Sequence, residues 1–259
     1  MPRISQLSRS VEGRVVVVTG AGSGMGRATA HLFADEGARV AAVDVTGDGV
    51  TAVVAEIAAA GGNAKAWTVD VSDRAAVEQL ISEVAAQFGG LDILVNNAGI
   101  SAAGPIDSDD YEARWARTLA VDLTAMTYTI RAALPHLRRS DNPRIINIAS
   151  TEGLGASPGN SAYTAAKHGV IGLTRGLAVE LGRDGITVNC ICPGPIRTGM
   201  TERIGEDAKQ AYARRRTALG RYGAPEEVAQ MTLSLALPAA SFVTGVALPV
   251  DGGLTIRRG

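Results

Sequence analysis

Short apolar runs alternate with longer stretches of mixed polarity from one end of the chain to the other. The runs lie at 15–19, 39–45, 63–71, 91–97, 144–150, 185–191 and 246–253. Continuous apolar runs of this kind are typical of strands that are covered on both faces. Helical stretches between them predict an α/β fold with a doubly wound parallel sheet, built by right-handed crossovers.

The connecting segments include two long helical stretches and one irregular stretch. The helices are expected around 111–138 and 161–183, and the irregular, charge-rich stretch spans 194–223. This stretch follows the end of a strand, where loops that cover ligands occur, so we expect a mobile substrate loop. No linker or repeat divides the chain, which predicts one domain over 1–259.

The composition of the 259 residues narrows the functional class. A formal net charge of -1 leaves no basic footprint for a nucleic-acid partner. No apolar run is long enough to cross a membrane, and the polar segment 1–13 lacks a signal-peptide core. Cys190 and Cys192 are expected to be buried and reduced, which fits a cytoplasmic location. The scattered histidines, His31, His136 and His168, predict no metal site.

A glycine-rich stretch, TGAGSGMG at 19–26, directly follows the first apolar run. Its glycines allow a tight turn and close approach of the backbone to a phosphate at a helix N-terminus. Asp44 ends the second run, where a carboxylate accepts both ribose hydroxyls and repels a 2′-phosphate. No arginine or lysine follows at Val45 or Thr46, so the sequence favours NAD over NADP.

Three motifs together resemble the short-chain dehydrogenase/reductase family in its compact form. They are the TGxxxGxG spacing, NNAG at 96–99, and YxxxK at Tyr163 and Lys167. The resemblance covers almost the whole chain. It implies a three-layer Rossmann fold with a seven-stranded parallel sheet, a small alcohol or ketone substrate, and a homotetramer.

The resemblance also implies a set of cofactor-binding residues. In it, Asp70 contacts adenine, Thr198 binds the nicotinamide amide, and Lys167 binds the nicotinamide ribose. The full set is Gly20, Ser23, Gly24, Met25, Gly26, Asp44, Val45, Asp70, Val71, Asn97, Ala98, Gly99, Tyr163, Lys167, Pro193, Gly194, Ile196 and Thr198.

Ser150, Tyr163 and Lys167 are the candidate catalytic residues. Tyr163 and Lys167 lie one helical turn apart, on one face of the predicted helix. A phenol with a pKa of about 10 is a poor base at neutral pH, but a nearby ammonium and an oxidised nicotinamide favour its phenolate. In the resembling family the tyrosine exchanges a proton with the substrate oxygen, and the serine at the position of Ser150 orients that oxygen.

Asp122 is a departure from the family pattern, because the family has an asparagine at this position. There the asparagine holds a water on a proton path from the lysine, partly through its main-chain carbonyl, which Asp122 retains. A carboxylate near Lys167 is either a working member of this relay, a residue that tunes its pH dependence, or a lesion. We add Asp122 to the catalytic candidates and hypothesise that it is tolerated.

The sequence favours an NAD-dependent enzyme that interconverts a secondary alcohol and a ketone. The alternatives are an NADPH-dependent 3-oxoacyl thioester reductase and a catalytically weak, nucleotide-binding regulatory protein. Segments 101–106, 152–160 and 195–222 are expected to shape the substrate pocket. We interpret Arg214, Arg215 and Arg216 as a solvated helix face, with anion binding as the alternative. Glu152 and Asn160 fit substrate contact and polar loop surface equally well.

Overall fold

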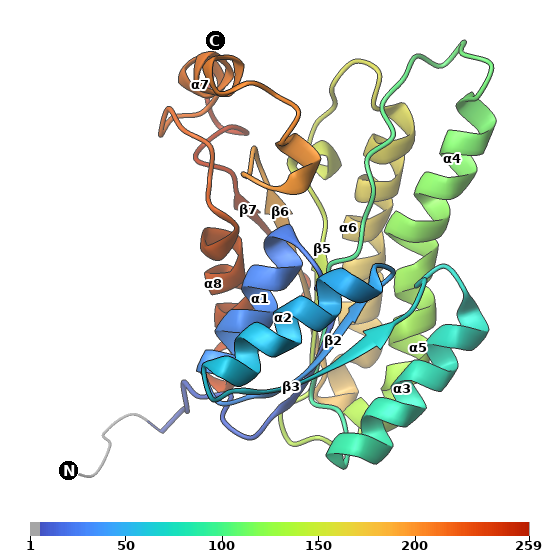
Figure 1. The fold of residues 1–259 in the computed structure, drawn as a ribbon, viewed down its shortest axis with the longest axis vertical. Helices are drawn as coiled ribbons and strands as arrows, with labels where there is room; N and C mark the ends of the chain where they lie inside the picture. Colours follow the sequence, from blue (N-terminus) through green and yellow to red (C-terminus); the bar gives the residue numbers. More distant parts are fainter. Residues whose placement is uncertain (1–5, 259) are drawn as a thin grey trace.

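All seven expected strands form within residues 6–258, the part of the chain that the computed structural model describes. They are β1 (Val15–Thr19), β2 (Arg39–Asp44), β3 (Asn63–Thr68), β4 (Ile93–Asn96), β5 (Arg144–Ile148), β6 (Thr187–Pro193) and β7 (Ala247–Val250). They pair in parallel in the order β3-β2-β1-β4-β5-β6-β7. The doubly wound, three-layer fold expected from the sequence is confirmed (Figure 1).

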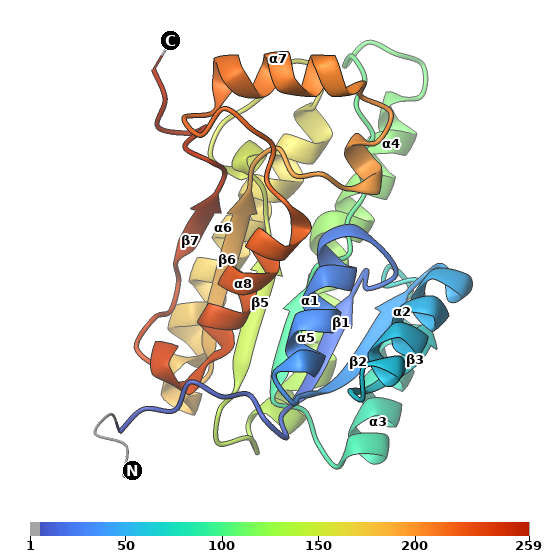
Figure 2. The same ribbon diagram turned by 60° about the vertical axis from the view of Figure 1, so that its left-hand side comes forward.

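Helices cover both faces of this sheet (Figures 1 and 2). The helices are α1 (Gly24–Asp35), α2 (Gly47–Ala59), α3 (Arg74–Phe88), α4 (Tyr111–Leu119), α5 (Ala125–Leu137), α6 (Ser161–Leu181), α7 (Glu206–Arg216) and α8 (Pro225–Ala236). Short 3-10 turns lie at η2 (Thr151–Gly153), η3 (Gly182–Asp184), η4 (Gly199–Thr201) and η5 (Pro238–Ala240). Helices α1, α2 and α8 cover one face, and α3, α5 and α6 cover the other.

The apolar runs are continuous because successive side chains of a strand enter two different cores. Val17 packs with Leu80 and Ile130, under α3 and α5. Its neighbour Val16 packs with Phe33 on the opposite face, under α1. Since adjacent strand residues point to opposite faces, a strand that is covered on both sides has to be apolar at every position.

Two predicted stretches form differently from the simplest expectation. The helix expected around 111–138 is interrupted by a π-helical turn, η1 (Ala120–Thr124), which joins α4 to α5. The irregular stretch at 194–223 contains a regular helix, α7, with Glu206 and Asp207 in its first turn and arginines in its last turn. These charges oppose the helix dipole at both ends, which stabilises a helix with little apolar character. Helix α7 lies beyond the C-terminal ends of the strands (Figure 2).

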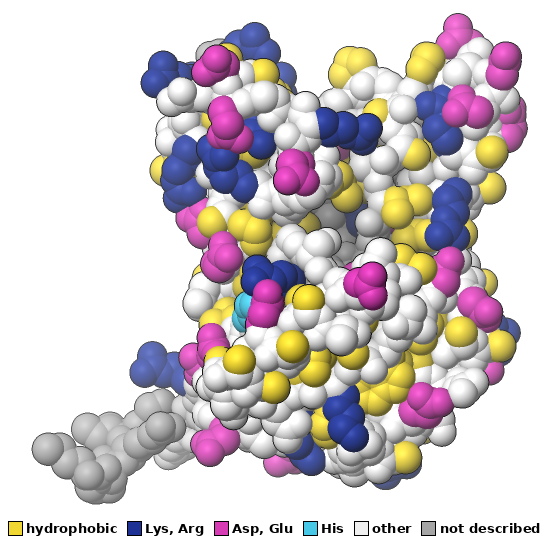
Figure 3. Space-filling model, in the orientation of Figure 1, with side chains coloured by type: hydrophobic (Ala, Val, Ile, Leu, Met, Phe, Trp, Pro, Cys, Tyr) yellow, Lys and Arg dark blue, Asp and Glu magenta, His cyan; other side chains and the backbone are white. Residues whose placement is uncertain are grey.

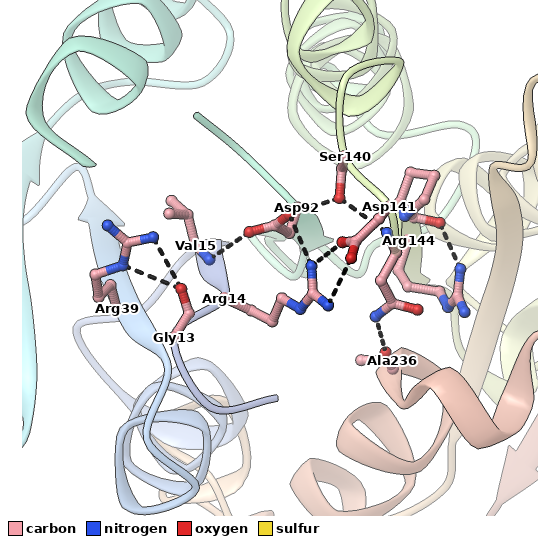
Figure 4. A network of polar contacts seen from close by, with 11 residues as sticks. Gly13, Arg14, Val15, Arg39, Asp92, Ser140, Asp141, Arg144 and Ala236 are labelled. Carbon is pink, nitrogen blue, oxygen red and sulfur yellow. Dashed lines mark hydrogen bonds and ion pairs between the residues drawn. The ribbon is translucent and has the colours of Figure 1, made fainter. Parts of the chain in front are cut away.

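A polar network joins the segments that lead into the strands, at the N-terminal ends of those strands (Figure 4). The guanidinium of Arg14 pairs with Asp141, and it lies 3.6 Å from the carboxylate of Asp92. Asp92 in turn accepts hydrogen bonds from the Val15 N–H at 2.8 Å and the Ser140 hydroxyl at 2.5 Å. The network therefore links the starts of β1, β4 and β5, at the opposite ends of these strands from α7.

Three further expectations concern single features. Cys190 and Cys192 are buried and free, as predicted. Within residues 6–258, no helix has the length and apolar character that crossing a membrane requires. In the same range, no cluster of three histidine, cysteine or acidic side chains is arranged to hold a metal ion. Of the polar segment 1–13, residues 1–5 lie outside the described residues.

Candidate active site

The glycine loop between β1 and α1 is pressed against the end of β4. Gly20 and Gly24 have positive φ angles of 66° and 54°, which favour glycine. A Cβ on Gly26 would lie 1.9 Å from the carbonyl oxygen of Gly20. The Asn97 side-chain amide donates to the carbonyls of Thr19 and Gly20, at 2.9 and 3.1 Å. The loop is therefore fixed by contacts that leave no room for a side chain.

The N-terminus of α1 suits a phosphate. The Ser23 side chain makes no capping hydrogen bond, and the first turn of α1 contains no acidic residue. The free N–H groups and the positive end of the helix dipole are therefore left for an anion. A dinucleotide pyrophosphate fits this cradle, and Gly24 lets its backbone approach.

Asp44 lies beside this loop, as the sequence predicted. Its carboxylate accepts hydrogen bonds from the Gly22 N–H and the Thr46 N–H, both at 2.9 Å, and from the Thr46 hydroxyl at 2.6 Å. Val45 follows it with 61% of its surface exposed. The carboxylate is thus held rigidly at the end of β2, where the ribose of a dinucleotide is expected.

Many of the predicted cofactor-binding residues line one hollow at the C-terminal edge of the sheet. These are Gly20, Asp44, Val45, Asp70, Val71, Ala98 and Gly99. Arg117 also lines this hollow, and it donates to Ser72 at 2.9 Å and to Asp70 at 3.2 Å. Hydrogen bonds from Ser72, together with the charge of Arg117, lower the pKa of Asp70. Asp70 is therefore anionic at neutral pH and positioned by its neighbours.

The remaining predicted cofactor-binding residues lie around the ends of α1 and β6. The Cβ and Cγ2 atoms of Thr198 would each lie 3.2 Å from a Cβ on Gly24, and the two residues line a second hollow. Pro193 ends β6, and the Gly194 N–H donates to the carbonyl of Val250 at 3.0 Å. Two side chains of the predicted set, Met25 and Ile196, instead pack against the hydrophobic core beneath α1.

Tyr163 and Lys167 lie together on α6. The Lys167 ammonium is 5.3 Å from the centre of the Tyr163 ring, and the residue is only 3% exposed. It donates to the carbonyl oxygen of Ile148 at the end of β5, at 3.1 Å. The cation is therefore anchored to the strand end that leads to Ser150.

Ser150 follows β5 on a turn that packs directly on α6. The Ser150 hydroxyl accepts from the Glu152 N–H at 3.1 Å, and a Cβ on Gly153 would lie 2.7 Å from the carbonyl oxygen of Lys167. The Thr164 hydroxyl donates to the Glu152 carboxylate at 2.8 Å. These contacts bring the turn that carries Ser150 against the helical turn that carries Tyr163.

Asp122 is buried beside the same lysine. The π-helical turn turns it fully inward, with 0% of its surface exposed. Its Oδ1 atom accepts from the Ile100 N–H at 2.7 Å, whereas its Oδ2 atom has no hydrogen-bond partner among residues 6–258. A Cβ on Gly99 would lie 3.0 Å from Oδ1 of Asp122 and 3.5 Å from Nζ of Lys167, so both groups border Gly99. Burial raises the pKa of Asp122, against the opposing charge of Lys167 and the Ile100 hydrogen bond.

A cavity of about 920 Å³ opens from Ser150. It is bordered by the 150–157 turn and by η4, α7 and Tyr222, so two of the three predicted pocket segments contribute. The third, 101–106, does not line this cavity, whereas Leu254, Thr255 and Arg257 of the C-terminal segment do. Figure 3 shows the corresponding hollow between the block that holds α7 and the block that holds the start of α4.

Two positioning residues were missed by the sequence analysis. The Thr19 hydroxyl accepts from the N–H groups of Asn97 and Ala98, at 3.0 and 3.1 Å, so it joins the glycine loop to NNAG. Thr19 is the first residue of the glycine-rich stretch at 19–26, so its place in that motif could have identified it from the sequence. Arg117 had no local signal, because its partner Asp70 lies 47 residues away.

Comparison with known proteins identifies the family of this chain. A family model described as enoyl-(acyl carrier protein) reductase matches residues 20–255. The chain belongs to the short-chain dehydrogenase/reductase family. The family that the motifs indicated is therefore confirmed.

Relatives of this short-chain dehydrogenase/reductase match it over nearly its whole length. It is 41% identical over 248 residues to a meso-2,3-butanediol dehydrogenase from Serratia marcescens, covering 96% of this chain and 97% of the relative. It is 39% identical over 246 residues to a 3-oxoacyl-acyl-carrier-protein reductase from Thermotoga maritima, covering 95% and 99%. A dehydrogenase/reductase structure from Sinorhizobium meliloti superposes with a TM-score of 0.90 at 42% identity, covering 95% and 97%. The protein is an oxidoreductase of CH–OH groups that uses an NAD(P) cofactor.

Asp122→Asn is expected to stabilise the folded protein at neutral pH. Because the pKa of Asp122 is raised on folding, the folded state binds the proton more tightly than the unfolded chain does. The ionised carboxylate therefore costs stability at neutral pH, and this cost disappears as the pH falls through the raised pKa. Thermal unfolding should show a higher Tm for the variant, by about 2–4 °C for each kcal/mol gained, with the difference narrowing toward about pH 4.

The exposed Asp109→Asn provides the control, because it removes a carboxylate without removing a buried charge. A Tm difference that is the same at all pH values would contradict the titration of Asp122. We hypothesise that Asp122 is tolerated, so its asparagine variant should change kcat by less than about tenfold. A hundredfold gain would show instead that the natural residue impairs catalysis.

Proposed function

We propose that this enzyme interconverts a secondary alcohol and a ketone with NAD(H), using Tyr163 as the general acid and base. The geometry of Lys167 carries the proposal, because its buried ammonium lies 5.3 Å from the centre of the Tyr163 ring and so places a cation beside this phenol. Tyr163 takes the hydroxyl proton in oxidation and returns it in reduction. Ser150 orients the substrate oxygen through its hydroxyl. The bound nicotinamide supplies the hydride chemistry.

Asp44 supports the preference for NAD. Its carboxylate is held beside Gly22 by two backbone N–H groups and one hydroxyl. A 2′-phosphate at this place would meet a fixed negative charge, whereas ribose hydroxyls would donate to it. In addition, Val45 and Thr46 offer no cation in exchange.

Titrations of the protein with NADH and NADPH test the cofactor preference. We expect NADH to bind at least about tenfold more tightly, which corresponds to about 1.4 kcal/mol. Asp44→Ala should narrow this ratio, because it removes the repulsion of the phosphate. The readout is the ratio of the two Kd values. The substitution also removes the hydrogen bond from the Gly22 N–H, but the resulting loosening of the loop should weaken the binding of both cofactors together and so leave the ratio unchanged. Asp35→Ala, which removes an exposed carboxylate at the end of α1, should leave the ratio unchanged.

A second candidate is the NADPH-dependent reduction of a 3-oxoacyl thioester. The similarity to the Thermotoga maritima reductase favours it. Equal or tighter binding of NADPH in the same titration would reject the NAD proposal and support this reductase.

We further propose that the chain forms one domain, assembles as a homotetramer and acts in the cytoplasm, in keeping with the family resemblance.

A further inference from the structure

The arginine run at the end of α7 is divided by the geometry of the helix. The side of α7 that borders the cavity carries Ala208, Ala211, Tyr212, Arg215 and Arg216. Their spacing of three to four residues places most of them on one face of the helix. Arg214 lies directly before Arg215 in the sequence but does not line the cavity. Arg214, Arg215 and Arg216 are all exposed, as expected of a solvated helix face. Two of them, Arg215 and Arg216, nevertheless border the cavity.

Arg215 and Arg216 have unpaired guanidinium groups among the described residues. Two other arginines near α7 are paired, since Arg197 binds Glu206 at 2.6 Å and Arg221 binds Glu227 at 2.7 Å. Among the described residues Arg203 and Arg214 are also without an ion-pair partner, but neither lines the cavity. Within residues 6–258, no carboxylate lies within ion-pairing distance of Arg215 or Arg216, and their side chains form no hydrogen bond. Two cations that border the cavity are therefore left without an internal partner.

The other charges of the cavity wall are already engaged. Arg257 donates to the carbonyls of Arg214 and Thr217, at 2.8 and 2.6 Å, and so ties down the end of α7. Glu152 is the carboxylate of the lining, and it accepts from the N–H and hydroxyl of Ser157 and from Thr164. The described lining thus carries three cations and one anion, and that anion is satisfied by other donors.

We propose that Arg215 and Arg216 bind an anionic group of the substrate, which is a secondary alcohol or ketone bearing a carboxylate or phosphate away from the reacting carbon. This inference rests on the proposed function of the same cavity. Guanidinium groups bind carboxylate and phosphate oxygens through paired N–H donors. The volume of about 920 Å³ accommodates a substrate that spans from Ser150 to α7.

Matched ketone pairs that differ in charge test the proposal. Levulinate is compared with levulinamide, and 4-oxocyclohexanecarboxylate with its amide, for carboxylate recognition. Dihydroxyacetone phosphate is compared with dihydroxyacetone, for phosphate recognition. Each pair is measured for kcat/KM with the reduced form of the cofactor that binds more tightly, and for binding to the protein with its oxidised cofactor, where no reduction occurs.

At least one anionic ketone should have a kcat/KM about tenfold or more above that of its neutral partner, in line with a charge-assisted hydrogen bond. Arg215→Ala and Arg216→Ala should each reduce this preference about fivefold or more, without changing the neutral ketone. Arg214→Ala is the matched control, because it removes a neighbouring charge that lies outside the cavity wall, and it should preserve the preference. High salt should weaken the preference, because both arginines are exposed.

The outcomes separate this proposal from the proposed function. Reduction of neutral and anionic ketones alike would overturn the anion site and leave the oxidoreductase chemistry intact. Arginine-dependent binding of an anionic ketone without any reduction would support the site and contradict the proposed reaction. An equal loss of preference in Arg214→Ala, or no anion preference in either measurement, would overturn the assignment to Arg215 and Arg216.

Discussion

Tyr163→Phe should lower kcat by about 10³-fold, within the range typical of a lost general acid and base. The substitution removes the hydroxyl that we propose exchanges the proton, and it keeps the ring beside the Lys167 ammonium. NADH affinity should change by less than about threefold, because the contacts of the glycine loop and Asp44 remain. Steady-state kinetics and a NADH titration on the same preparation measure both quantities.

Tyr111→Phe is the matched control for this substitution. The Tyr111 hydroxyl lies 2.7 Å from that of Ser161, at the start of the helix that carries Tyr163. Its loss removes a phenol from the same region without touching Lys167, so kcat should stay close to that of the natural protein. If Tyr163→Phe kept more than about a tenth of the natural kcat, the assignment of Tyr163 as the proton donor would be wrong.

Gly26→Ala should abolish or severely weaken cofactor binding. The added Cβ would lie 1.9 Å from the Gly20 carbonyl oxygen and 2.5 Å from the Asn97 amide nitrogen. Neither group can move without displacing the loop, because Asn97 also holds the carbonyls of Thr19 and Gly20. We expect NADH to bind at least about tenfold more weakly. We also expect the free energy of unfolding to fall by at least the ~1–3 kcal/mol typical of overpacking. Calorimetric titration and denaturant unfolding measure the two effects.

Gly182→Ala separates this clash from the general effect of adding a methyl group. Gly182 has helical backbone angles of −60° and −33°, and apart from the adjoining chain no atom of the described residues lies within 4 Å of a Cβ placed there. Alanine is intrinsically better than glycine in helical conformation, so this variant should be as stable as the natural protein or more so. Normal NADH binding by Gly26→Ala would show that the loop tolerates the methyl group and that the tight fit is not required.

Asp44 and Asp122 illustrate opposite uses of a carboxylate in this protein. Asp44 meets the glycine loop with three donors around it, and we propose that its charge favours NAD over NADP. Asp122 is buried with one hydrogen-bond donor, and its other oxygen has no partner in the described part of the chain. We therefore propose Asp44 as a specificity element, whereas the ionised carboxylate of Asp122 costs stability because it is buried.

The sequence by itself determined the parallel α/β fold and the family. Continuous apolar runs specify strands that are covered on both faces, and all seven of them formed. The proximity of Tyr163 and Lys167 was also predictable, because residues four apart on a helix share a face. The glycine spacing predicted a tight loop at the start of α1, and the positive φ angles of Gly20 and Gly24 confirm it. These are local properties, which short stretches of chain express without reference to distant segments.

The tertiary structure alone decided the surroundings of these motifs. The π-helical turn that buries Asp122 has no signal in the hydrophobic pattern, and it depends on how α4 and α5 pack around it. The Arg117–Asp70 pair and the entry of Arg257 into the cavity wall join segments that are far apart in the sequence. Such contacts follow from crossovers and helix orientation, which bring distant side chains together. The folded chain also distinguishes Arg215 and Arg216, which line the cavity, from their neighbour Arg214, which does not. The sequence could not do so, because a residue's position along a helix does not say which side of the helix faces a cavity.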